Sequence, residues 1–179
     1  MKKRISVFAL ILLLAMALCV PAQAIRDYGV IYDETEMLGS DTLAMQGEET
    51  LPELSEALGI DLRVDVLTVI SSDSIGEAAA DIYDSYEYGY GENKEGITLT
   101  ILLEPLETGG YAMAEDGWCI YVSLNAARGD SQELANTVRD AVEPYMVERA
   151  WNGKDMNMSA VALTQAVDAM AVSAEAYIL

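Results

Sequence analysis

The stretch GITLTILL, residues 96–103, decides the fold of this chain of 179 residues. After Gly96, every side chain in it is apolar or β-branched, and no charged residue interrupts the run. Such a strand is typical of a sheet covered on both faces, because a solvated face would carry polar residues at alternate positions. We therefore expect residues 97–103 to form a central strand between two helical layers.

The segments before this strand alternate between strand and helix. Residues 30–32 form a short apolar strand, and residues 60–70 form a longer one in which apolar and charged residues alternate at first. A helix is predicted after Ser74, because Ser74 and Glu77 have the spacing of a capping box and apolar residues recur behind them at helical intervals.

The segment between the first two strands predicts a helix with an interruption. Its apolar face begins near Leu38 and ends before Gly59. Pro52 lies inside this pattern and cannot donate a helical hydrogen bond. We expect a break or kink near Thr50, with Pro52 in the first turn of a second helical piece.

Two strands and two helices are predicted after the central strand. Residues 111–114 and 118–124 are expected to pair as a hairpin, because Asp116-Gly117 is a typical turn pair. The last two helices carry the apolar stripes Leu134, Val138, Ala141, Tyr145 and Leu163, Val167, Met170, Ala174, Tyr177. With this hairpin written as one β element, the order β-α-β-α-β-β-α-α predicts an α/β fold, a three-layer α/β/α sandwich with a mixed central sheet.

The first 24 residues predict a secretory signal peptide. They combine the basic start MKKR, an apolar run from Ile5 to Val20 and a small-residue exit at residues 22–24. The alternative is a retained membrane anchor, but the apolar run of about 16 residues would barely span a bilayer. We expect a secreted, extracytoplasmic protein with one domain at residues 25–179 and no stable membrane span after cleavage.

The charge and the missing histidine exclude several functions. Without the three basic residues of the leader, 7 basic residues face 30 acidic ones, a net charge of −23. Such a field repels nucleic-acid phosphates, so nucleic-acid binding is excluded. The chain has no histidine, which excludes a Ser-His-Asp triad and a zinc-histidine site. Cys119 is expected to be a buried core residue rather than a reactive thiol.

Acidic residues follow the predicted strands, where open α/β sheets place their ligands. Asp33 ends the first strand, Asp73 follows the second and Glu104 ends the third, so we expect these three to form a metal site. Carboxylates that converge repel one another until a hard cation such as Ca²⁺ or Mg²⁺ neutralises them. Asp81 and Asp84 could approach from the following helix.

Four tyrosines close to this edge are candidates for an aromatic platform for a glycan or a peptide. Helical spacing predicts that Tyr83 and Tyr86 face the core. Tyr88 and Tyr90 are then expected to be exposed.

The succession of these motifs resembles the TPM domain family over about residues 29–170. The matching features are Asp33 after the first strand, a glycine turn before NKEGITLTILL at residues 93–103, and Pro144 in the penultimate helix. The resemblance implies an exported or anchored α/β/α domain, with acid phosphatase activity and divalent-cation binding in some members and roles with membrane complexes in others. Pro52 and the long connection from Glu104 to Asp116 depart from the family pattern, and without a transmembrane tail the resemblance implies a freely secreted form.

Three functions remain open at this point. The first is a non-catalytic module at the cell envelope that binds a divalent cation or a partner, either an envelope protein or a membrane complex. The second is a metal-assisted acid phosphatase that uses a carboxylate cluster, since a bound metal can activate water without histidine. The third is a cell-wall or glycan-binding module.

Overall fold

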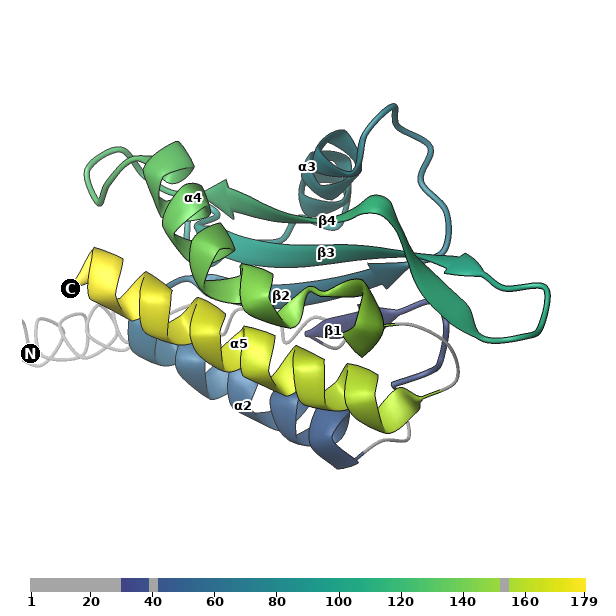
Figure 1. Cartoon of the computed structure of the whole chain (residues 1–179). Helices are drawn as coiled ribbons and strands as arrows, with labels where there is room; N and C mark the ends of the chain where they lie inside the picture. Colours follow the sequence, from purple (N-terminus) through teal and green to yellow (C-terminus); the bar gives the residue numbers. More distant parts are fainter. Residues whose placement is uncertain (1–29, 39–41, 152–154) are drawn as a thin grey trace, which may run out of the picture.

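A computed structural model describes residues 30–38, 42–151 and 155–179, and the expected leader lies outside these ranges. Within them, four strands form one mixed sheet in the order β1-β2-β3-β4 (Figure 1). β1, β2 and β3 are parallel, and β4 is antiparallel to β3. The bounds are Ile31–Asp33 for β1, Asp61–Leu67 for β2, Gly96–Pro105 for β3 and Tyr111–Ser123 for β4. The predicted central strand is β3, which lies between β2 and β4.

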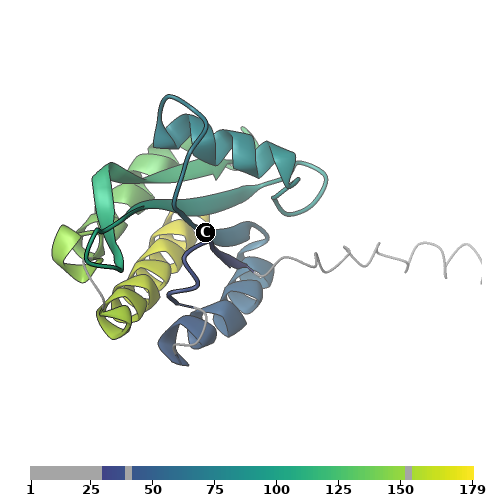
Figure 2. The ribbon, with the colours of Figure 1, turned by 90° about the vertical axis from the view of Figure 1, so that its right-hand side faces the viewer.

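Helices cover both faces of the sheet, which confirms the predicted three layers (Figures 1 and 2). Of the described helices, α3 covers one face, α2 and α4 contact the other, and α5 packs against α2 and α4. None of these described helices has the length and apolar character needed to cross a membrane. Their bounds are Thr42–Leu58 for α2, Ile75–Ser85 for α3, Ser131–Val142 for α4 and Met156–Ile178 for α5, with short 3₁₀ turns at Glu143–Tyr145 and Glu148–Ala150.

The sheet face toward α2, α4 and α5 forms the apolar core. Alternate residues of the two inner strands are fully buried there: Leu62, Val64, Val66, Ile97, Leu99 and Ile101. The predicted stripe of α5 meets them with Leu163, Val167, Met170 and Ala174, all buried. Burial of this apolar surface is the main favourable contribution to folding.

The sheet face toward α3 is different, because the intervening positions carry polar side chains. Arg63 and Asp65 come from β2, Thr98 and Thr100 from β3, and Cys119 and Tyr121 from β4. The first four are buried. The register aligns Tyr32, Asp65, Thr100 and Cys119 as one row across the four strands.

The first helix is not broken near Thr50, so of the predicted break or kink only a kink stays a prediction. α2 continues through Pro52 as one helix from Thr42 to Leu58. Proline removes one helical hydrogen bond. The helix nevertheless continues, because Leu51 and Leu58 are buried in the core on either side of that position and hold the segment against the sheet.

The predicted hairpin at Asp116-Gly117 is wrong. β4 is one long strand, and residues 114–117 form a bulge opposite Leu102. Asp116 has a positive φ of 52°, and a Cβ on Gly117 would lie 2.5 Å from the Ala114 carbonyl oxygen. Both a bulge and a tight turn need residues in the left-handed backbone conformation, and an Asp-Gly pair adopts it readily in either one. The turn between β3 and β4 instead lies at residues 106–110, where the Leu106 N–H donates to the Gly110 carbonyl.

Candidate functional site

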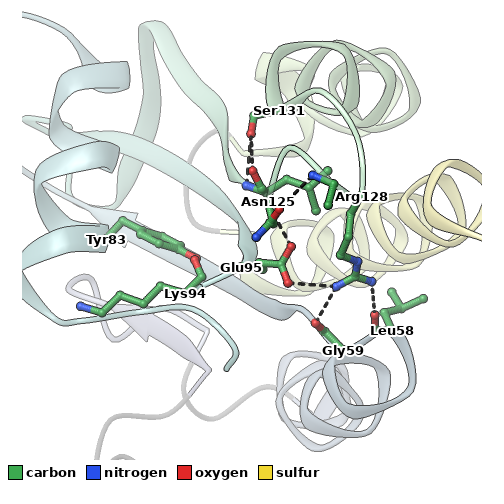
Figure 3. Close-up of polar contacts among 10 residues, drawn as sticks. Leu58, Gly59, Tyr83, Lys94, Glu95, Asn125, Arg128 and Ser131 are labelled. Carbon is green, nitrogen blue, oxygen red and sulfur yellow. Dashed lines mark hydrogen bonds and ion pairs between the residues drawn. The ribbon is translucent and has the colours of Figure 1, made fainter. Parts of the chain in front are cut away.

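A polar network lies at the amino ends of β2 and β3, and its side chains form hydrogen bonds with one another and with nearby backbone groups (Figure 3). Glu95 accepts hydrogen bonds from the Asn125 N–H at 2.9 Å and from Arg128 Nη1 at 3.3 Å. Arg128 also donates to the carbonyls of Gly59 and Leu58 at the end of α2, at 3.0 and 2.9 Å. The guanidinium therefore caps this helix and ties it to the loop after β4, which is a structural role.

Asp33 lies at the carboxyl end of β1, as predicted, but its carboxylate is used by its own loop. Oδ1 accepts hydrogen bonds from the Thr35 N–H at 2.9 Å and from the Thr35 hydroxyl. Oδ2 accepts one from the Leu38 N–H at 2.8 Å. Asp33 therefore orders the turn that leads away from β1.

Asp73 and Glu104 are exposed and lie on separate elements. Asp73 is in the loop between β2 and α3, and Glu104 is in β3, where it pairs with Ala112 of β4. Within the described residues, no three acidic, cysteine or histidine side chains are grouped to hold a metal ion. The structure thus does not bring Asp33, Asp73 and Glu104 together as one ligand set, and binding of Ca²⁺ or Mg²⁺ stays a prediction.

A cleft of about 330 Å³ lies between the carboxyl ends of β1 and β2 and helix α3. We call it the carboxyl-edge cleft. Its volume is at the lower end of the range of roughly 300–1,000 Å³ that ligand pockets occupy. It is lined by Tyr32, Glu34, Leu67, Val69, Ile70, Ser71, Ser72, Ala78, Asp81, Ile82, Ser85 and Tyr86.

Two carboxylates from different elements line this cleft. Glu34 follows β1, and its Oε2 accepts hydrogen bonds from the N–H and the hydroxyl of Thr68 at 2.8 and 3.0 Å. Asp81 comes from α3, and its Oδ2 accepts a hydrogen bond from the Ser72 hydroxyl at 3.0 Å. These contacts orient both carboxylates at the cleft while both side chains remain exposed.

Two tyrosine rings form another part of the lining. Tyr32 and Tyr86 are 37% and 42% exposed, and their ring centroids lie 6.5 Å apart. The pKa of Tyr32 is raised, first by partial burial and then by the nearby charge of Glu34.

The predicted exposure of the tyrosines is half right. Tyr83 is buried and Tyr90 is exposed, as expected. Tyr86 is exposed and Tyr88 is only 3% exposed, the reverse of the prediction. The reason is that α3 ends at Ser85, so helical spacing no longer sets the direction of Tyr86.

Tyr88 links the cleft to the buried polar face of the sheet. Its ring stacks against Tyr86 with 5.8 Å between centroids and 24° between planes. The Arg63 guanidinium lies 4.2 Å from the centre of the Tyr88 ring and is paired with Asp61 at 2.8 Å. The Tyr88 hydroxyl donates a long hydrogen bond of 3.4 Å to Asp65 Oδ1.

Asp65 is a buried carboxyl with incomplete hydrogen bonding. Only 1% of its surface is exposed, and burial raises its pKa to about 7 although the Arg63 charge acts in the opposite direction. Its Oδ2 and the hydroxyls of Thr98 and Thr100 have no hydrogen-bond partner of good geometry in the described part of the chain. Such groups are costly to bury and are found at functional sites more than elsewhere.

The sequence places Glu34 directly after Asp33 at the end of the first strand, and it led us to expect Asp81 near the strand ends, but it did not identify Tyr32 and Asp65 as site residues. One signal was available in the strand at residues 61–67, where Arg63 and Asp65 alternate with apolar residues although helices flank the strand on both sides in sequence. Charged residues on one face of a covered strand indicate a buried polar layer.

The described residues form an α/β domain with a small cleft at the carboxyl edge of its parallel strands. No protein-family model matches the chain, and no curated protein matches it. The chain is similar to the NMR structure of BA42 protein from the psychrophilic bacterium Bizionia argentinensis, at 12% sequence identity over 75% of this chain and 82% of that one, with a TM-score of 0.43. A similarity of this size carries no functional argument.

Proposed function

We propose that the chain is an exported, non-catalytic binding module that holds a cationic ligand in the carboxyl-edge cleft. The observation that carries this proposal is the lining of the cleft. Glu34 and Asp81 contribute two negative charges, and none of the described lining residues is a lysine or an arginine. The chain as a whole has a net charge of −20, which adds a long-range attraction for cations.

The two alternatives fit this lining less well. A phosphate monoester would meet two carboxylates in the cleft, so its binding would require a metal ion to bridge the charges. A neutral glycan could stack on Tyr32 and Tyr86, but it would give the two carboxylates no partner of opposite charge. The predicted leader supports export, so the ligand would be met outside the cytoplasm.

Calorimetric titration of the exported protein with calcium, with magnesium and with a short lysine-containing peptide tests this function. We expect at least one of these cations to bind with a stoichiometry near one. The double variant Glu34→Gln/Asp81→Asn should lose that binding, because the cleft then has no negative charge.

The matched control is Glu107→Gln/Glu115→Gln, which removes the same number of charges from exposed positions in the region of the β3–β4 turn and bulge. The control should bind as the unmodified protein does. Equal losses in both double variants would mean that only the general charge attracts the cation, and the proposed site would be wrong.

A further inference from the structure

The aromatic part of the carboxyl-edge cleft is suited to a particular kind of cation. The exposed rings of Tyr32 and Tyr86 lie at 36° to one another and belong to the same cleft as Glu34. The face of a tyrosine ring carries partial negative charge and attracts a cation within about 6 Å of its centroid. Two rings beside a carboxylate should therefore bind an organic cation more strongly than a carboxylate alone.

The ring of Tyr86 is supported from the buried side of the protein. It stacks on Tyr88, which is itself held by Arg63 beside its ring and by Asp65 at its hydroxyl. A ring that is already fixed loses little conformational freedom when a ligand binds. This support also gives Arg63 and Asp65 a role, because they hold Tyr88, and Tyr88 in turn positions the Tyr86 ring at the cleft.

The remaining lining combines apolar side chains with three serines. Val69 is 72% exposed at the cleft, and Ile70 and Ile82 are half-buried there. A Ca²⁺ or Mg²⁺ ion uses oxygen ligands and would leave this surface and the rings unused. The side chain of lysine or arginine uses all three features, because it has an apolar stem and a charged end.

We propose that the carboxyl-edge cleft binds the side chain of a lysine or arginine in a basic segment of a partner protein. The charged group lies over the rings of Tyr32 and Tyr86 and pairs with Glu34 or Asp81, while the methylene stem covers Val69 and Ile82. This inference rests on the proposed function and names the class of its ligand. The strongly negative protein would attract such a partner, and the attraction would weaken as salt is added.

The test uses the exported protein and an acetylated, amidated Gly-Lys-Gly-Lys-Gly peptide, with binding measured by calorimetry. We expect the peptide to bind, and we expect the same peptide with both lysines acetylated to show no binding. Acetylation removes the charge and keeps the stem, so it isolates the contribution of the cation.

Variants of the rings separate this inference from simple charge attraction. Tyr86→Leu should weaken peptide binding by about threefold to tenfold, because an apolar side chain of similar reach has no π face. Tyr86→Phe should bind nearly as well as the unmodified protein. Tyr90→Leu, which changes an exposed tyrosine outside the cleft lining, is the matched control. If Tyr86→Leu fails to fold, as judged by circular dichroism, Tyr32→Leu takes its place with the same expected loss.

The outcomes distinguish this inference from the proposed function. Binding of calcium or magnesium that depends on Glu34 and Asp81, without binding of the lysine peptide, would overturn the inference and leave the proposed function standing. Peptide binding of equal strength in folded Tyr86→Leu and in Tyr32→Leu would also overturn it. If no cation binds at all, both proposals are wrong.

Discussion

The two faces of the sheet use the same strands in opposite ways. On β2, Leu62 and Val64 belong to the apolar core, whereas Arg63 and Asp65 lie on the face toward α3 and are buried there. The first face follows the rules for a stable interior. The second face buries charged side chains and polar atoms that lack a hydrogen-bond partner. Such groups are costly to bury and are not needed for folding.

Under the proposed function, this difference separates stability from recognition. The apolar face supplies the burial that holds the domain together. The polar face costs stability, but its Arg63 and Asp65 hold Tyr88, and Tyr88 supports the ring of Tyr86 in the cleft. Proteins tolerate such a cost where the arrangement has a function. Removing the buried Asp65 charge from the polar face should therefore stabilise the protein, whereas truncating an apolar side chain in the core should destabilise it.

The largest effect on stability is expected on the apolar face. Leu99 is fully buried in the core, so Leu99→Ala should lower the free energy of unfolding by about 2–5 kcal/mol through lost burial and a new cavity. Urea unfolding followed by circular dichroism measures this change. Cation binding by the molecules that remain folded should be unchanged, and a loss below about 1 kcal/mol would contradict the assignment of this face as the main source of stability.

A change of opposite sign is expected on the polar face. The pKa of Asp65 is raised from 3.8 to about 7 in the folded protein, so folding favours the protonated carboxyl. The stability that the protonated Asp65 carboxyl contributes is fully present below the pKa that this group has in the unfolded chain. It is lost as the pH rises through about 7, the pKa in the folded protein. Asp65→Asn has no charge to bury, and relative to the unmodified protein it should gain on the order of 2–4 kcal/mol between pH 4 and pH 8.

Urea unfolding of both proteins over this pH range measures the gain. The difference between them isolates Asp65 from the other acidic residues, which titrate in both. If the free energies of unfolding of the two proteins changed with pH in parallel, Asp65 would have an ordinary pKa, and burial of its charge would not destabilise the polar face.

A smaller effect is expected at Cys119, which lies on the same polar face under α3. Its Sγ donates a long contact of 3.6 Å to the Ile75 carbonyl, and burial raises the pKa of the thiol to about 11. The thiol should react slowly with a bulky maleimide in native buffer and rapidly in denaturant. Cys119→Ser should cost about 1–3 kcal/mol. Rapid labelling of the native protein would show that α3 does not cover this part of β4.

The layers and the element order could be predicted from the sequence. The strand at residues 97–103 has no charged residue on either face, and the helices are amphipathic, so helices must pack on both faces of the sheet. The candidate site could be predicted only in its location at the carboxyl edge. Asp33 was the natural choice there, but its carboxylate is used by the N–H groups of Thr35 and Leu38. The next residue, Glu34, reaches the cleft instead, because successive side chains along a strand point to opposite faces.

Tertiary contacts explain the tyrosines that the sequence misplaced. The chain turns back after α3, where the Tyr88 N–H donates to the Tyr83 carbonyl at 2.9 Å. This turn places Tyr88 beneath Tyr86 and against Arg63, a residue from a strand more than 20 positions earlier in the chain. Helical spacing describes contacts within one element and could not reveal this one.

The central claim is that ligand recognition belongs to the side of the sheet that carries α3. The most direct test is an NMR titration of the isotope-labelled exported protein with the lysine peptide. We expect amide shifts to change at residues 32–34, 67–72 and 78–86, which surround the carboxyl-edge cleft, while α4 and α5 stay unchanged. The main contradiction would be shifts confined to the apolar groove between α4 and α5, around Ala141, Ala169 and Val172, because that result would place recognition on the side that the account assigns to stability.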